Sequence, residues 1–232
     1  MKISDLRNVK IGKRELIVIL AVLVFAVAAV LIVRNSDSAN RNKRYSSSFV
    51  GMGETINVTC YGKNGKTAVK EAKSKIRAVI KTTDSVADLM TAAAVTIEEN
   101  NVTSALITIG ENVLCIGAKP DGSLWRVGIK GPGKSGSSPM GAVKVRDCAV
   151  FTVPDEDGEY SVTVVSENPD FAEDMADEMA AKTLDAAVTY WQQETEGADQ
   201  WEMIFITEDA VYATEGLKEI FSCSDTVFWI EK

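Results

Sequence analysis

The stretch from residue 104 to 130 restricts the fold of this chain more than any other part. It holds three short strand-like runs, at 104–109, 112–118 and 123–130. Between the last two runs, Lys119-Pro120-Asp121-Gly122 has the residues that a tight hairpin turn requires. Polar and apolar residues alternate at 104–109 and 123–130, as they do at 54–62, which is typical of antiparallel strands with one covered face. We therefore expect a mainly antiparallel sheet at the centre of the molecule.

Helices and further strands are expected on both sides of this stretch. Strand-like runs lie at 54–62, 142–146, 148–153 and 159–166, and two or three more strands are expected within 201–232. Helical periodicity is found at 65–81, at 85–100, and in one long helix that Asn168-Pro169 opens as N-cap and first residue. Helices and strands do not alternate strictly. The expected fold class is therefore α+β, with helices packed on the sheet in a single domain at 49–232.

The helix expected at 65–81 has two distinct faces. Its apolar face includes Val69, Ala72 and Ile76, and it should pack on the sheet. Another face is basic and holds Lys66, Lys70, Lys73, Arg77 and Lys81. The basic face could hold an anion, but a solvated helix surface is the simpler interpretation.

The N-terminal part holds one unbroken apolar run, from Leu16 to Val33. A run of about 18 residues is at the short end of what crosses a bilayer as a helix. A cleaved signal peptide is the rival interpretation, but no clear small-x-small site precedes a polar mature start. We expect a cytoplasmic tail at 1–15, a transmembrane signal anchor at 16–33 and a Ser- and Asn-rich linker at 34–48. The flanking basic residues slightly favour a cytoplasmic N-terminus, which places the domain outside the cytoplasm at the cell membrane.

The composition of the chain excludes several classes of function. The net charge of −8 and the pI near 4.8 argue against nucleic acid as a partner, because phosphate binding needs a cationic surface. The chain has no His, which removes His-based catalytic triads and most zinc sites. Its four Cys residues form no CxxC motif. Buried free thiols are favoured for them, and disulfides stay an alternative.

Several motifs, taken in order, resemble one family of enzymes. Residues 52–62 (MGETINVTCYG) resemble the opening motif of the FAD:protein FMN transferases, the ApbE-type flavin transferases. Residues 104–128 are similar to the central strands of that family, and residues 161–165, 171–177 and 204–213 (IFITEDAVYA) are similar to its late motifs. The resemblance covers most of the chain after the linker. It implies an α+β domain that uses FAD and Mg²⁺ and transfers FMN to a Thr or Ser hydroxyl of a target protein.

The chain departs from the family where the family binds flavin. The family's GGD motif aligns with Gly110-Glu111-Asn112, so the resemblance implies these three residues as the cofactor-binding candidates. A second Gly and an Asp are lost there, and the bulk and charge of Glu111 would hinder close approach of a phosphate. The family's Gly-rich DxGGxAKG element has no counterpart. Only residues 154–159 (PDEDGE) stand in place of its HxxDPxTG segment.

The resemblance also implies a metal site on the late helix. The family's metal-binding Asp and Thr align with Glu173 and Asp177. Residues four apart share a helix face, so two oxygen ligands could converge on Mg²⁺. The alternative is an acidic, solvent-facing start of a helix, where carboxylates suit the helix dipole.

Three functions remain open at this point. The first is a membrane-anchored, shortened and degenerate relative of the flavin transferases, with a binding or accessory role toward a flavin, a metal or an envelope protein. The second is an active Mg²⁺-dependent transferase with FAD as donor, in which Asp or Glu replaces His as the base. The third is a membrane-tethered domain of unrelated function. The missing segments favour the first function. Its expected partners are the membrane and a flavinylated or envelope protein, and no catalytic residue is assigned.

Overall fold

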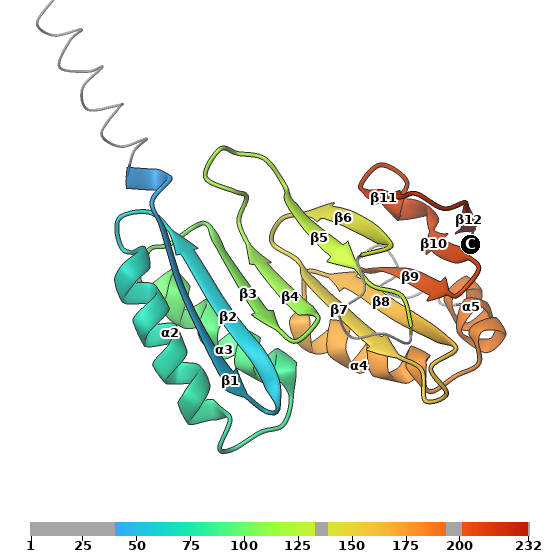
Figure 1. Cartoon of the computed structure of the whole chain (residues 1–232), viewed down its shortest axis with the longest axis horizontal. Coiled ribbons are helices and arrows are strands. Elements are labelled where there is room, and N and C mark those ends of the chain that lie inside the picture. Colours follow the sequence, from blue (N-terminus) through green and yellow to red (C-terminus); the bar gives the residue numbers. More distant parts are fainter. Residues whose placement is uncertain (1–39, 133–138, 194–200, 232) are drawn as a thin grey trace, which may run out of the picture. The chain divides into compact units, whose positions relative to one another are not determined.

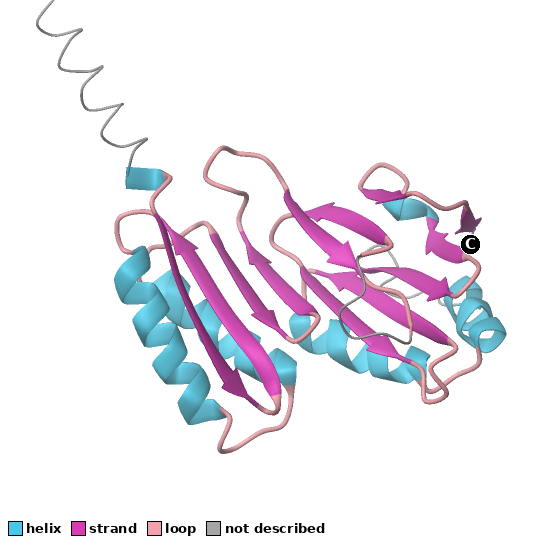
Figure 2. Ribbon diagram, viewed as in Figure 1, coloured by secondary structure: helices cyan, strands magenta, loops and turns pink. Residues whose placement is uncertain are grey.

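A computed structural model describes residues 40–132, 139–193 and 201–231, and Asn42–Lys232 forms one compact unit (Figures 1 and 2). Its strands are Arg44–Gly51 (β1), Glu54–Tyr61 (β2), Ala105–Ile109 (β3), Asn112–Ile116 (β4), Trp125–Ile129 (β5), Gly141–Val145 (β6), Ala149–Pro154 (β7), Tyr160–Ser166 (β8), Trp201–Thr207 (β9), Val211–Thr214 (β10), Phe221–Cys223 (β11) and Val227–Ile230 (β12). Its helices are Gly65–Val79 (α2), Val86–Glu99 (α3), Pro169–Ala180 (α4) and Leu184–Gln193 (α5), with a short 3₁₀ turn, η3, at Glu215–Leu217.

Two sheets organise this unit. The larger one has nine strands in the order β1-β2-β3-β4-β7-β8-β9-β10-β12, and the smaller one has the order β11-β6-β5. Neighbouring strands are antiparallel throughout, except that β10 and β12 run parallel. The expected mainly antiparallel α+β domain is therefore confirmed.

The two faces of the large sheet are covered differently along its length. On one face, α2 and α3 pack beside β1 to β4 and α4 packs beside β7 and β8 (Figure 1). We call the apolar cluster on this face the helix-side cluster; it includes Ile76, Met90, Ile107, Phe151 and Phe205. On the other face the small sheet covers the strands from β4 onward. The cluster beneath it, the sheet-side cluster, includes Val127, Val143, Val150, Ile204 and Ala213.

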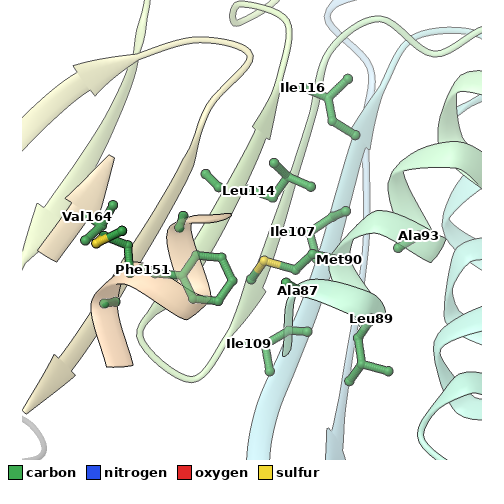
Figure 3. Close-up of a cluster of buried hydrophobic side chains, with 14 of the residues drawn as sticks. Ala87, Leu89, Met90, Ala93, Ile107, Ile109, Leu114, Ile116, Phe151 and Val164 are labelled. Carbon is green, nitrogen blue, oxygen red and sulfur yellow. The ribbon is translucent and has the colours of Figure 1, made fainter. Parts of the chain in front are cut away.

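The large sheet has an earlier half, β1 to β4, and a later half, β7 to β10 with β12, and the helix-side cluster joins the two. Figure 3 shows Met90 of α3, Ile107 of β3 and Phe151 of β7 in one group of buried side chains. The direct pairing of the halves is short, because β4 and β7 share only the pairs Val113–Val150 and Leu114–Ala149. Side-chain packing therefore contributes much of what holds the halves together.

Residues 44–48, which we expected in the linker, are instead part of strand β1. Alternation explains the difference, because Tyr45 and Phe49 lie two positions on either side of Ser47 and pack on the helix-side cluster. The serines between them hid this period-two pattern in a segment of linker-like composition. The ordered domain thus begins earlier than residue 49.

The single long helix expected after Asn168 is divided into α4 and α5. The N-cap is as expected, because the Asn168 side chain accepts hydrogen bonds from the amides of Asp170 and Phe171. The break follows Ala180, where the hydroxyl of Tyr160 donates to the carbonyl oxygens of Met179 (2.8 Å) and Lys182 (2.6 Å). These carbonyls therefore find a partner outside the helix, and the helix ends there.

Among the described residues, no helix has the length and apolar character needed to cross a bilayer. The anchor predicted at 16–33 lies outside the described residues, as do the tail at 1–15 and the linker up to residue 39.

Candidate functional site

A cleft of about 280 Å³ opens where β5 of the small sheet passes beside β3 and β4 of the large one. Its lining comes from β3, the β3–β4 turn, β4, β5 and β7: Leu106, Thr108, Gly110, Glu111, Val113, Trp125, Arg126, Val127, Gly128, Lys130 and Thr152. The cleft therefore contains two of the three predicted cofactor-binding residues, Gly110 and Glu111.

Gly110 makes the β3–β4 turn that closes one end of the cleft. Its φ of +59° is in the left-handed region that favours glycine, and its amide donates to the carbonyl of Thr55 (3.1 Å). A Cβ at this position would lie 3.0 Å from Oε2 of Glu54. The single Gly is thus favoured by the positive φ of the turn, whereas the exposed Glu54 side chain could move aside for a Cβ.

Glu111 and Lys130 face each other across the cleft. The ammonium of Lys130 donates to Oε1 of Glu111 at 3.0 Å, and the two side chains are 33% and 42% exposed. Arg126 also lines the cleft and is exposed. Two cations and one carboxylate therefore surround the opening. The negative charge of Glu111, which the sequence suggested would repel an anion, is paired with Lys130.

Asn112, the third predicted cofactor-binding residue, has a different environment. Its Oδ1 accepts a hydrogen bond from the amide of Thr152 at 2.9 Å. This bond supplements the short pairing of β4 with β7. The contact gives Asn112 a role in joining strands, and Asn112 does not line the cleft.

The sequence analysis did not single out the β5 wall of the cleft. Arg126, Gly128 and Lys130 are exposed or half-buried, whereas Trp125, Val127 and Ile129 are buried. The period-two alternation in WRVGIK predicts this division. What the sequence could not supply is the register that brings β5 beside β3 and β4, because β5 pairs with β6 of the other sheet.

The predicted metal ligand Glu173 lies on α4 and binds the start of α3. Its Oε2 accepts from Oγ of Ser85 (2.6 Å) and the amide of Ala87 (3.0 Å), and its Oε1 accepts from the amide of Val86 (2.8 Å). Amides in the first turn of a helix have no partner within the helix, and a carboxylate there also suits the helix dipole. Glu173 is therefore a cap supplied by one helix to another.

Asp177 is exposed one turn further along α4. Burial raises its pKa, and the neighbouring charges of Glu173 and Asp174 raise it further. In the part of the chain that the structure describes, no group of three His, Cys, Asp or Glu side chains could hold a metal. Three donors take three of the roughly four acceptor positions of the Glu173 carboxylate. Because the described residues also supply no third acidic ligand, they do not fit Mg²⁺ bound between Glu173 and Asp177.

All four cysteines are free. Burial raises the pKa of the Cys60 and Cys115 thiols to about 12 and that of Cys148 to about 11. A thiol acts as a nucleophile through its thiolate, so these three are inert near neutral pH.

Comparison with known proteins finds one family model that matches part of this chain and solved structures with a similar fold. The ApbE family model matches residues 85–164, which run from the N-cap of α3 into β8. The fold is similar to the apo form of the Pseudomonas stutzeri flavinyl transferase ApbE, with a TM-score of 0.57 and 12% identity over 77% of this chain and 96% of that one. It is also similar to the Vibrio cholerae flavin transferase ApbE, with a TM-score of 0.58 and 13% identity over 77% of this chain and 99% of that one. No match was found among curated proteins. The match of residues 85–164 to the family model and the shared fold support an ApbE-type family member.

Proposed function

We propose that the chain is a degenerate ApbE-type domain with a binding or accessory role, which has kept the flavin-transferase scaffold without FMN transfer. The single observation that carries the proposal is the environment of Glu173. The carboxylate that aligns with the family's metal ligand accepts three hydrogen bonds from the start of α3.

The chemistry of the reaction explains why this observation matters. Moving FMN from FAD to a hydroxyl requires a cation to neutralise the pyrophosphate and a base to accept the hydroxyl proton. A metal at Glu173 would find one free acceptor position, on Oε1, and bidentate binding would displace at least one of the three donors and leave it without a partner. The hydrogen bonds from the start of α3 to Glu173 stabilise the fold, and they compete with the metal binding that the reaction needs.

The cleft supports binding of a small group more than of a whole dinucleotide. Its volume of about 280 Å³ is just below the range of roughly 300–1,000 Å³ found for ligand pockets. Trp125 and Val127 offer apolar surface, while Arg126 and Lys130 offer positive charge. A flat ring with one anionic substituent fits this lining, and part of a flavin has that character.

The experiment uses residues 42–232, the compact unit that contains both apolar clusters. This fragment is mixed with FAD, Mg²⁺ and an acceptor protein with an accessible Thr or Ser, and AMP release and covalent flavin are followed. We expect neither product, and we expect FAD binding, where present, to be independent of Mg²⁺. Robust transfer would overturn the proposal and establish the active enzyme. Transfer that persists in a Glu173→Ala, Asp177→Ala double variant would also exclude these residues from the mechanism.

We further propose that residues 16–33 stay attached and anchor the protein as a single-pass membrane protein with its domain outside the cytoplasm. The support is the unbroken apolar run with basic residues on both sides. N-terminal sequencing of the membrane fraction should find the original N-terminus. A sequence that begins after residue 30 would show that the segment is cleaved.

A further inference from the structure

The strongest concentration of positive charge in the described chain lies on and around α2. Residues 63–81 contain seven Lys or Arg residues and one acidic residue, Glu71. The whole chain carries −8, so the remainder carries −14. Four of the cations, Lys66, Lys70, Lys73 and Arg77, are spaced to fall on one side of the helix, and we call them the basic stripe.

The basic stripe is exposed and lies against the edge of the large sheet. Lys66, Lys70 and Arg77 are exposed, whereas Lys73 is half-buried and donates to Oγ of Ser47 in β1 (3.2 Å). The ammonium of Lys73 and the guanidinium of Arg77 both lie 5.2 Å from the ring centroid of Phe49. Contacts with β1 thus hold two of the cations in place, which reduces the entropy lost when they bind a ligand.

Within the described ranges, no member of the stripe forms an ion pair with a carboxylate. The acidic residue of the segment, Glu71, accepts instead from the amide group of Asn100 at 2.7 Å. A cationic surface whose charges are not neutralised within the domain attracts anions from solution.

We propose that the basic stripe docks on the anionic phospholipid surface of a membrane and thereby sets the orientation of the domain. Two observations favour a membrane over other polyanions. The remaining charge of −14 would repel a long polyanion that wraps the molecule, whereas a flat bilayer meets one surface at a time. The second is that the stripe lies beside the point where the chain enters the domain, a short stretch of sequence after the apolar run at 16–33.

The chain enters the domain beside the stripe. Ten residues separate Val33 from Arg44, the first residue of β1, and even fully extended they span only about 35 Å. The amide of Gly62 donates to the carbonyl of Lys43 at 3.0 Å, so the entry point lies next to the start of α2. A domain tethered this closely meets the bilayer at high effective concentration. This proximity rests on the proposed anchor, whereas the charge of the stripe does not.

The test measures co-sedimentation of residues 42–232 with vesicles of phosphatidylcholine and phosphatidylglycerol in equal parts, and with pure phosphatidylcholine vesicles. The fragment lacks the apolar run, so its binding tests the surface alone and is independent of the anchor. We expect binding to the anionic vesicles only, weakening as salt is raised. The variant Lys66→Gln, Lys70→Gln should lose roughly tenfold to thirtyfold in affinity, because each basic residue near an anionic surface contributes about 1 kcal/mol.

The matched control is Lys75→Gln, Lys144→Gln, which removes the same charge from exposed positions on another side of α2 and on β6. It should change the vesicle affinity less than threefold. Equal loss in the control, equal binding to neutral vesicles, or no binding to anionic vesicles would each overturn the proposal. Binding to heparin without binding to vesicles would assign the stripe to another class of partner and overturn it as well.

Discussion

The two halves of the nine-stranded sheet differ in how many of their faces are covered. Strand β8, in the later half, is buried at all seven positions between α4 and the small sheet. In the earlier half, Ile56 and Val58 of β2 are buried under the helices, whereas Asn57 on the opposite face is half-buried and donates to Oγ1 of Thr108 (3.2 Å). The candidate cleft lies at the boundary of the two halves. A second layer that covers only part of a sheet therefore leaves space for a ligand where it ends.

The largest expected effect tests whether the later half is covered on both faces. Phe205 and Ile204 are adjacent in β9, are both 0% exposed, and face the helix-side and sheet-side clusters respectively. Phe205→Ala should lower the free energy of unfolding by about 3–5 kcal/mol, and Ile204→Ala by about 2–5 kcal/mol. In the earlier half, Ile107→Ala should cost a similar amount, but its neighbour Thr108→Ala should cost about 1 kcal/mol. Urea unfolding of the four variants measures these values.

The contrast between neighbours decides the outcome of this experiment. If Thr108→Ala costs as much as Ile204→Ala, the open face of β3 is covered in solution and the comparison fails. If Ile204→Ala is mild, the small sheet is not packed on the large one.

The next effect concerns Glu173, which joins the halves by binding α3 from α4. Glu173→Ala removes an acceptor from three donors and should lower the free energy of unfolding by roughly 2–3 kcal/mol, since bonds to charged groups contribute about 1.5–3 kcal/mol and the site is only half-buried. Glu173→Gln should cost less, because one oxygen remains. The exposed neighbour Asp174 provides the control, and Asp174→Ala should change stability by less than about 0.5 kcal/mol. Thermal unfolding with and without Mg²⁺ is the measurement.

Metal binding would produce a different pattern. If Mg²⁺ raises the melting temperature of the unaltered protein and Glu173→Ala abolishes that rise, Glu173 is a metal ligand and the proposed role as a cap is wrong. Equal melting temperatures with and without Mg²⁺ in both proteins would support the cap.

The fold could be predicted from the sequence where local pattern decides structure. Alternation identified the strands at 104–109 and 123–130, and a short apolar run between them identified the third. The Asn168 cap identified a helix start and the apolar stripe of α2 a helix face. Strand β1 was missed because its serines resemble a linker, and its pairing with β2 is a long-range property. The break between α4 and α5 was missed because its cause, Tyr160, lies on β8.

The candidate site was predictable in part for the same reason. Gly110 and Glu111 were identified from their motif, and both line the cleft. Lys130, the partner of Glu111, is 19 residues away in the sequence, and only the packing of one sheet on the other brings it near. Likewise, the i, i+4 spacing of Glu173 and Asp177 shows a shared helix face but not that the α3 start lies opposite Glu173.

A smaller effect would sharpen the role of the cleft at the boundary between the halves. Glu111→Gln removes the negative charge that Lys130 contacts and should change the free energy of unfolding by less than about 1 kcal/mol, because the pair is partly exposed. It should raise the affinity for a small anion such as phosphate, since Arg126 and Lys130 would then face the opening without a counter-charge. Isothermal titration with phosphate tests this, and Lys130→Gln should have the opposite effect. An unchanged affinity in both variants would show that anions do not enter the cleft.

The smallest effect separates an acidic helix start from a metal site at Asp177. Partial burial, then the charges of Glu173 and Asp174, raise the pKa of Asp177 above the ordinary value for an aspartate. A raised carboxyl pKa means that the charged form is disfavoured in the folded protein. The resulting loss of stability is fully present above the raised pKa of the folded state, and it disappears as pH falls below the ordinary pKa of the unfolded state. Asp177→Asn should therefore stabilise the protein at pH 7 by less than about 0.5 kcal/mol, given its exposure, and should have no effect near pH 3. Urea unfolding at the two pH values measures the difference. A destabilised variant at pH 7, with the loss appearing only when Mg²⁺ is present, would mean that Asp177 binds the metal and that α4 retains the family's site despite the cap at Glu173.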